Sequence, residues 1–205
     1  MTKYGLAINL TRCTGCKTCV VACKMQNNVP MGINWNRIEN EGMSQPDACV
    51  GVYPDVSRNV MPVACQHCEA APCVANCPTG ASYKDEQGRV LINYDLCIGC
   101  EVCMQSCPYD ARTRNVEEPR RDPDFNYGDW RVPVREQGVV EKCTLCKERT
   151  DDGKDPMCVV CCPMKARTFG DLDDASSDIS QLLNDKETFA YLEEAGTVPQ
   201  VHYYR

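Results

Sequence analysis

The sequence predicts an α+β fold made of two small modules, one nested inside the other, with a surface insertion and a C-terminal tail. Three observations support this prediction. Sixteen of the 18 cysteines fall into four groups of four. A short strand, a cysteine-containing loop, a short helix and a second strand recur along the chain. The linkers between the cysteine groups differ strongly in length, which favours one way of pairing them.

The four groups share one spacing pattern. Groups one and three read C-x2-C-x2-C-x3-C, and groups two and four are the same pattern with its middle gap stretched to four and eleven residues. In chain order the groups are Cys13, Cys16, Cys19 and Cys23; Cys65, Cys68, Cys73 and Cys77; Cys97, Cys100, Cys103 and Cys107; and Cys143, Cys146, Cys158 and Cys162. Bacterial ferredoxins hold [4Fe–4S] clusters on thiolates with this run. Sixteen such ligands predict four [4Fe–4S] clusters and indicate electron transfer.

The two strands of the recurring unit flank the cysteine groups. Residues 5–10 form an apolar run directly before Cys13, and residues 89–94 form a similar run before Cys97. Pro follows the last cysteine of groups two, three and four, and an Ala and a short extended segment come soon after it. Because Pro stops the helix that precedes it, each Cys-Pro marks the point where the chain turns into the second strand.

Linker lengths indicate how the groups pair. Only 19 residues, 78–96, join groups two and three, and Asp85-Glu-Gln-Gly88 within them is a hairpin signal. The other two linkers, 24–64 and 108–142, have 41 and 35 residues and are too long for direct hairpins. Groups two and three therefore belong to one compact module, and the simplest topology pairs groups one and four around it.

The predicted fold is thus a nested pair of two-cluster ferredoxin-like modules. In two-cluster ferredoxins the fourth cysteine of one run ligates the other cluster. Its parts are an outer module of residues 1–59 and 138–170, an inner module of residues 60–115, a surface excursion of residues 116–137 and a tail of residues 171–205. The predicted ligand sets are Cys13, Cys16, Cys19 and Cys162; Cys65, Cys68, Cys73 and Cys107; Cys97, Cys100, Cys103 and Cys77; and Cys143, Cys146, Cys158 and Cys23. The alternative pairs group one with two and group three with four.

Two other uses of so many cysteines fit the pattern less well. Disulfide-rich scaffolds are usually shorter, and triple C-x2-C-x2-C runs crowd their sulfurs onto one side. Zinc sites usually combine two separated Cys/His pairs, whereas this chain has only two histidines.

Two cysteines are left over. We interpret Cys49 as a free thiol and Cys161 as a packing residue, with Cys161 the alternative ligand to Cys162.

Polar residues near the ligands have more ordinary interpretations. Arg12, Lys17 and Lys142 lie beside ligands and could raise a cluster potential, but solvated or interface charges are the simpler expectation. His67 lies between two ligands, where we expect a hydrogen bond next to the cluster or a subunit contact. The gap from Lys147 to Met157 has the composition of a polar surface loop.

Composition limits the remaining functions. The net charge of −7 argues against nucleic acid as a partner, and no apolar run reaches the ~20 residues of a membrane span. The strand predicted close to the first residue leaves no room for a signal peptide.

Three Phe and two Trp make a thin apolar core, so metal binding should be coupled to folding. In the tail, Ile179, Leu182 and Leu183, and then Phe189 and Leu192, suggest one or two short helices.

Several motifs together resemble a known family. They are Arg12-Cys-Thr-Gly-Cys-Lys-Thr-Cys19, Cys65-Gln-His-Cys68 with Ala71-Pro72-Cys73, Cys97-Ile-Gly-Cys100, and the stretched second and fourth groups. With these motifs the chain resembles the iron–sulfur electron-transfer subunit of the DMSO reductase family of molybdopterin oxidoreductases. The ending Ala166-Arg-Thr-Phe-Gly-Asp-Leu-Asp-Asp174, with Glu194-Ala-Gly-Thr197, is most similar to polysulfide, tetrathionate and arsenate reductase subunits.

The resemblance implies partners and a location. It implies a large catalytic subunit with a molybdenum or tungsten bis-pterin cofactor, and a quinone-linked membrane subunit or another redox carrier. It also implies clusters loaded in the cytoplasm and a final place outside it, at the membrane through partners, with a cytoplasmic place as the alternative. The alternative function is a polyferredoxin-type subunit of a hydrogenase or formate dehydrogenase. The substrate of such a complex is determined by its catalytic subunit.

Overall fold

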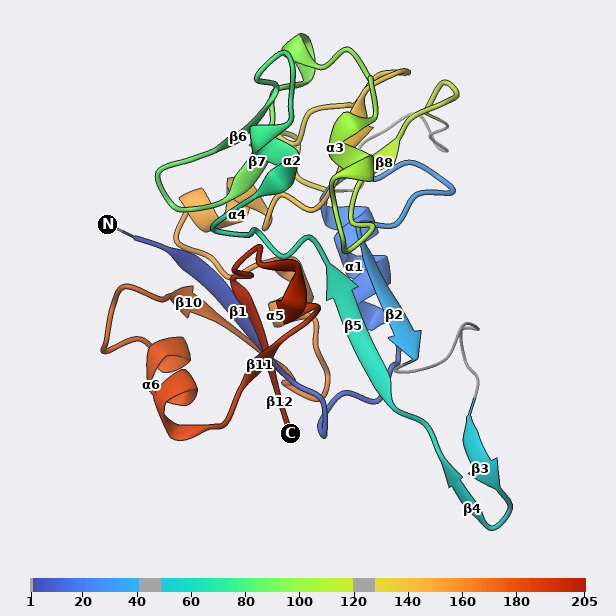
Figure 1. The fold of residues 1–205 in the computed structure, drawn as a ribbon, viewed down its shortest axis with the longest axis vertical. Helices are drawn as coiled ribbons and strands as arrows, with labels where there is room; N and C mark the ends of the chain where they lie inside the picture. Colours follow the sequence, from blue (N-terminus) through green and yellow to red (C-terminus); the bar gives the residue numbers. More distant parts are fainter. Residues whose placement is uncertain (1, 41–48, 120–127) are drawn as a thin grey trace.

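The computed structural model describes residues 2–40, 49–119 and 128–205 (Figure 1). Its strands are β1 Tyr4–Asn9, β2 Asn36–Asn40, β3 Val50–Val52, β4 Asp55–Ser57, β5 Val60–Ala64, β6 Ser82–Lys84, β7 Val90–Ile92, β8 Thr113–Arg114, β9 Val140–Glu141, β10 Arg167–Asp171, β11 Phe189–Ala190 and β12 Val201–Tyr204. Its helices are α1 Thr18–Gln26, α2 Pro72–Ala75, α3 Val102–Gln105, α4 Lys147–Asp151, α5 Met157–Val160 and α6 Asp178–Asp185, with 3-10 turns η1 Tyr94–Leu96 and η2 Glu193–Ala195. Short strands and short helices alternate, as expected of an α+β fold.

The recurring unit predicted from the sequence is present. Each of the helices α1, α2, α3 and α5 lies just before or around the last cysteine of its group. The Cys-Pro dipeptides lead into β6, β8 and β10, as the Ala-containing segments predicted. The predicted hairpin is also confirmed, because β6 pairs antiparallel with β7 and Asp85 accepts hydrogen bonds from the backbone N–H groups of Gln87 and Arg89 in the turn.

The largest sheet joins the two ends of the described chain. Its strand order is β10-β1-β12-β11, with β1 antiparallel to β10 and parallel to β12. Leu6, Ile8 and Tyr203 are buried on one side of it. Ile179 of α6 is fully buried against the sheet with Ala7. Residues 201–204 are therefore a central strand and not an appendage.

One local expectation was wrong, and another was met only in part. The gap after Cys146 was expected to be a loop, but residues 147–151 form α4, in which Thr150 is buried. In the tail, α6 matches the first predicted helix, whereas Phe189 lies in β11 and pairs with Tyr203. A strand of two residues leaves no periodicity that a sequence can reveal, so pairing with β12 decides the conformation here.

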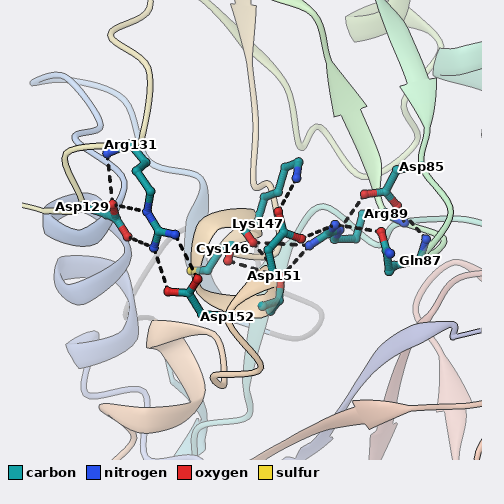
Figure 2. A network of polar contacts seen from close by, with 10 residues as sticks. Asp85, Gln87, Arg89, Asp129, Arg131, Cys146, Lys147, Asp151 and Asp152 are labelled. Atoms are coloured by element: carbon teal, nitrogen blue, oxygen red, sulfur yellow. Dashed lines mark hydrogen bonds and ion pairs between the residues drawn. The ribbon is translucent and has the colours of Figure 1, made fainter.

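Helix α4 is held by a polar network that links the two predicted modules (Figure 2). Arg89, at the end of the β6–β7 hairpin, donates to Asp85 and to Asp151, each at 2.7 Å, and to the Thr150 hydroxyl at 2.6 Å. Asp151 also pairs with Lys147. Because Arg89 is buried and fully paired, this network fixes the hairpin against α4.

Two segments extend from the core. The β3–β4 hairpin projects away from the rest of the molecule (Figure 1), and all six of its strand residues are exposed. The predicted excursion lies partly outside the described residues. Within its described part Trp130 is exposed, whereas Val132 and Arg135 are buried. In the described residues, no helix is both long and apolar enough to cross a membrane.

Candidate iron–sulfur sites

The four cysteine loops curl in the same way. The residue before the second cysteine of each group has a positive φ: Gly15 at 67°, His67 at 45°, Gly99 at 64° and Leu145 at 57°. This left-handed conformation suits glycine and costs other residues energy. It turns the backbone so that consecutive cysteines point to one side. Two loops use glycine, and the other two hold a bulkier residue in the same strained position.

The structure brings the sixteen predicted ligands together in four cavities, each lined by all four cysteines of one predicted set. The sets are Cys13, Cys16, Cys19 and Cys162; Cys65, Cys68, Cys73 and Cys107; Cys77, Cys97, Cys100 and Cys103; and Cys23, Cys143, Cys146 and Cys158. Each cavity has three cysteines of one group and the last cysteine of its partner group. We call these the first, second, third and fourth cavities, after the group that contributes three cysteines.

The cavities form a row. Arg167 lines both the first and the fourth cavity. Cys65 belongs to the second cavity and also lines the fourth. Arg112 lines the second cavity and interacts with Cys103 of the third. The order is therefore first, fourth, second, third. The first and third cavities each have one exposed cysteine, Cys16 and Cys100, so both ends of the row reach the surface.

Backbone N–H groups point at the sulfurs. The donors are Ser82 to Cys77 at 3.4 Å, Leu145 to Cys143 at 3.3 Å, Met157 to Cys146 at 3.5 Å, Ala166 to Cys162 at 3.3 Å and Val140 to Cys97 at 3.5 Å. Such bonds stabilise thiolates and the clusters that they hold. The donors come from the turns after the cysteines and from neighbouring strands, so the fold itself supplies them.

Burial opposes ionisation of the inner cysteines. Desolvation raises the pKa of the Cys68 thiol to about 11 and that of the Cys146 thiol to about 12. Asn27 partly offsets this in the fourth cavity, because its amide donates to Cys23 and Cys146 at 3.6 and 3.7 Å. A metal that binds here must displace thiol protons and supply the missing positive charge. Iron does both, so the donor set fits [4Fe–4S] clusters.

The cysteines are not gathered for a single ion. Among the described residues, no three or more His, Cys, Asp or Glu side chains are arranged to hold one metal ion. A tetrahedral zinc site needs four such ligands around one centre. A cubane cluster is a larger object, with one iron at each of four corners, and its four cysteines stand further apart than those of a zinc site.

The charged residues near the ligands differ from the sequence expectations. Arg12 and Lys17 are exposed, as expected. Lys142, expected to be solvated, is buried and donates to the carbonyl oxygens of Val90 and Cys143. His67 is also buried, so it is not a surface contact. Its Nδ1 accepts from the Val90 N–H at 3.1 Å, and burial together with Lys142 keeps its pKa well below the usual value.

The leftover cysteines are not members of the four sets. Cys49 is exposed, and Cys161 does not line any of the four cysteine cavities. Among the side chains that contact ligand sulfurs and that sequence reasoning missed are three buried ones, Asn27, Arg112 and Arg167. Two of them carry a visible signal, because Ala-Arg-Thr follows Cys-Pro at the same distance in groups three and four. By itself that repeat indicates a shared backbone turn and does not reveal where its arginines point.

Comparison with known proteins identifies the family. Residues 56–121 and 130–172 match the family described as the 4Fe-4S dicluster domain, and residues 10–26 match a 4Fe-4S binding domain. A Halobacterium salinarum protein named as an iron–sulfur subunit of a dimethyl sulfoxide reductase is 48% identical, over 99% of this chain and 79% of its own length. This chain belongs to the iron–sulfur subunits of the DMSO reductase family of molybdopterin oxidoreductases. The resemblance seen in the motifs is thus confirmed.

Other relatives in this family serve different reductases. The arsenate respiratory reductase iron–sulfur subunit of a Shewanella species is 38% identical, over 99% of this chain and 96% of its own length. One of the chains of the Wolinella succinogenes polysulfide reductase is 36% identical, over 97% of this chain and 92% of its own length. As an iron–sulfur subunit of this family, the chain has [4Fe–4S] domains and transfers electrons.

Proposed function

We propose that this subunit holds four [4Fe–4S] clusters, one in each cysteine cavity, with the sixteen cysteines as ligands in the four sets given above. Bound clusters supply one-electron redox chemistry and low reorganisation. The protein supplies the thiolates, the N–H donors to sulfur and an enclosed environment for the inner two cavities. The observation that carries this proposal is the grouping of four cysteines around each of four cavities.

We further propose that the subunit relays single electrons between a large catalytic subunit with a molybdenum or tungsten bis-pterin cofactor and a quinone-linked membrane subunit or another carrier. Two features support a relay with a partner at each end. The cavities lie in a row, and of the four cavities only those at the ends have an exposed cysteine, Cys16 or Cys100. We expect the complex outside the cytoplasm, held at the membrane by its partners. Cell fractionation tests that placement.

The β3–β4 hairpin supports contact with a partner near the first cavity. Val52 and Tyr53 at its tip are 83% and 89% exposed. The start of β5, which follows the hairpin in the chain, lies beside the first loop, because a Cβ at Gly15 would be 3.0 Å from the side chain of Val60. Contiguous exposed apolar side chains usually mark an interaction surface. We propose that the hairpin contacts the catalytic subunit.

Metal analysis of the native complex tests the whole proposal. The complex is isolated without oxygen, and iron, acid-labile sulfide, molybdenum, tungsten and zinc are measured together. We expect about 16 iron atoms per copy of this chain, in addition to any in a partner, and one molybdenum or tungsten per large subunit. Iron and sulfide without molybdenum or tungsten would favour the polyferredoxin alternative of a hydrogenase or formate dehydrogenase. Zinc without sulfide would overturn the cluster assignment.

A further inference from the structure

Two buried arginines occupy equivalent positions in the two halves of the cysteine pattern. Arg112 lies five residues after Cys107, and Arg167 lies five residues after Cys162. Both follow a Cys-Pro dipeptide and an Ala, and both precede a Thr. Their exposed fractions are only 2% and 7%. The same backbone turn therefore carries a long cationic side chain into the interior twice.

Arg112 lies between the second and third cavities. Its Nη2 donates to the Cys73 sulfur at 3.0 Å, and its Nη1 donates to the Ser82 hydroxyl at 2.8 Å. The guanidinium also interacts with the sulfur of Cys103. Cys73 belongs to the second set and Cys103 to the third, and each is the third cysteine of its group. One guanidinium thus contacts both sets.

Arg167 repeats this arrangement between the first and fourth cavities. Its Nη2 donates to the Cys19 sulfur at 3.5 Å and to Asn36 Oδ1 at 3.3 Å. It also interacts with the sulfur of Cys158, and it lines both cavities. Cys19 and Cys158 are again the third cysteines of their groups. Each arginine therefore bridges equivalent ligands of two neighbouring sets.

Neither arginine has a carboxylate partner among the described residues. The other two deeply buried arginines do: Arg89 pairs with Asp85 and Asp151, and Arg135 pairs with Glu141 at 2.7 Å. A buried cation without a counter-charge is strongly unfavourable. For Arg112 and Arg167 the neighbouring groups that can carry negative charge are cysteine sulfurs. In addition, the buried Nε–H of Arg112 has no hydrogen-bond partner in the described protein. These side chains are therefore placed for negative charge in the cavities.

We propose that Arg112 and Arg167 are positioning residues that raise the reduction potentials of two cluster pairs, Arg112 for the second and third cavities and Arg167 for the first and fourth. The inference rests on the proposed function. Adding an electron makes a cluster more negative, so a fixed cation and an N–H donor to sulfur stabilise the reduced state. Because each arginine contacts two sets, it shifts two potentials together.

The test is a redox titration of the complex, purified without oxygen and followed by EPR, for Arg112→Gln and Arg167→Gln. We expect the reduced-to-oxidised ratio of two clusters to fall about tenfold at a given potential, a shift of ~59 mV to more negative values for one electron. Arg112→Gln should shift two of the four potentials, and Arg167→Gln should shift the other two. Each variant is thus the control for the other, and no prior assignment of signals is needed.

Three outcomes would overturn the inference while leaving the clusters in place: unchanged potentials, equal shifts of all four potentials, or shifts of the same two potentials in both variants. Iron and sulfide are measured on every sample, and their absence from the unmodified complex would instead refute the proposed function. If a Gln variant loses iron, Arg112→Lys and Arg167→Lys provide the test instead. Lys keeps the positive charge but lacks the several N–H donors of the guanidinium group. The Lys variants should give smaller shifts in the same two potentials, and unchanged potentials would overturn the inference.

Discussion

At the scale of single residues, Gly99 illustrates how tightly the cysteine loops are packed. It has φ +64°, and a Cβ at this position would lie 1.9 Å from the carbonyl oxygen of Gly138. The positive φ and the contact with the Gly138 carbonyl both involve the backbone, so rotation of a side chain cannot relieve them. We predict that Gly99→Ala displaces Cys97 and Cys100 and removes about four iron atoms per chain. Iron analysis of the purified complex measures the loss.

Gly153→Ala provides the matched control. Gly153 has φ +70°, but its Cβ would meet nothing within 4 Å. It therefore shares the backbone strain of Gly99 without the clash. We expect this variant to keep its full iron content, with a stability loss of about 1 kcal/mol. Equal iron loss in both variants would show that the left-handed conformation, and not the contact with Gly138, is responsible.

The buried ion pair between Arg135 and Glu141 is a second residue-scale constraint. Arg135 donates to Glu141 at 2.7 Å and to the carbonyl oxygens of Asn27 and Asn28, and it lies over the ring of Trp35 at 4.8 Å. We predict that Arg135→Met costs about 3–5 kcal/mol, since it leaves a buried carboxylate unpaired. The midpoint of guanidinium-induced bleaching of the brown colour measures the loss.

The substitution Arg131→Met tests the loss of an ion pair at the surface. Arg131 pairs with Asp129 and Asp152, but all three side chains are partly exposed (Figure 2). Exposed pairs contribute little because water screens them, so we expect Arg131→Met to leave the unfolding midpoint close to that of the unmodified protein. Comparable losses in Arg131→Met and Arg135→Met would contradict the assigned role of burial.

Residue identities at the candidate sites were predictable because cysteine spacing is a strong local signal. The burial and contacts of the charged residues around these sites were not predictable. Lys142 follows Glu141 in a polar-looking stretch, yet both are buried, because Val90 of β7 lies against Lys142 and Arg135 lies against Glu141. Whether a cation is solvated or buried depends on which distant segment covers it, and no local pattern records that. The Arg112 and Arg167 contacts depend on the same packing.

At the scale of elements, the β3–β4 hairpin makes a prediction about assembly. Its exposed apolar tip contributes nothing to the described core. Replacing Val52 and Tyr53 by Ser should therefore leave iron content unchanged and weaken association with the catalytic subunit. Co-purification measured against salt and dilution checks this. Val116→Ser, which removes an exposed apolar side chain outside the hairpin, should leave association unchanged, and full assembly of the hairpin variant would contradict the proposed contact.

Helix α4 makes a prediction about pH. Burial would raise the pKa of Asp151, but hydrogen bonds from Lys147 and Arg89 outweigh it and leave this pKa below its usual value. A lowered pKa contributes stability above the unfolded value of about 3.9, and the contribution is lost as the pH falls through the folded value. The stability gap between the unmodified protein and Asp151→Asn should therefore be constant near neutral pH and shrink below about pH 4.

Guanidinium unfolding of both proteins across this pH range measures the gap. Any general acid lability of clusters affects both proteins and cancels in the difference. A gap that stays constant down to the lowest accessible pH would mean that Asp151 does not ionise more readily in the folded state. In that case the contacts of Arg89 with the Thr150 hydroxyl and the Lys147 carbonyl oxygen alone would hold the hairpin against α4.

Elements were predictable where covalent constraints dominate. Each Cys-Pro ends a helix and starts a strand, so the repeats of the unit could be placed from the sequence. Helix α4 was missed because its stabilising contacts come from Arg89, 58 or more residues earlier in the chain. Strand β12 was missed because its partner β1 is at the other end of the chain. Long-range pairing leaves little trace in local composition.

At the scale of the whole molecule, the core has two kinds of parts. One kind contains no cysteine: Leu6, Ile8, Tyr203 and their neighbours around the large sheet, with Ile179 of α6. The other kind contains ligand cysteines among a few small apolar residues, such as Cys73 and Cys103 with Val90 and Val140. In Figure 1 the large sheet with α6 lies toward one end of the molecule, and β6, β7, α2 and α3 lie toward the other.

This division predicts how the protein responds to loss of iron. Burying thiolates without a metal is unfavourable, so the cysteine-containing parts lose their main source of stability when iron is removed. The large sheet keeps its backbone hydrogen bonds and its contacts with α6, although its other face, with Leu6, Ile8 and Tyr203, lines the fourth cavity. We predict that chelation under reducing conditions unfolds β6, β7, α2 and α3 first and leaves the sheet β10-β1-β12-β11 partly protected. Amide hydrogen exchange, followed by mass spectrometry of peptides, resolves these regions.

The order of protection separates two accounts of folding. If the sheet forms a core of its own, amides of Leu6 and Tyr203 should exchange slowly after iron removal, while amides of Val90 and Met104 exchange at unprotected rates. Simultaneous loss of protection everywhere would mean that clusters and sheet fold as one cooperative unit. The first result is expected because α6 and β12 close the sheet without any cysteine, so the two ends of the chain can stay paired when the cavities between them collapse.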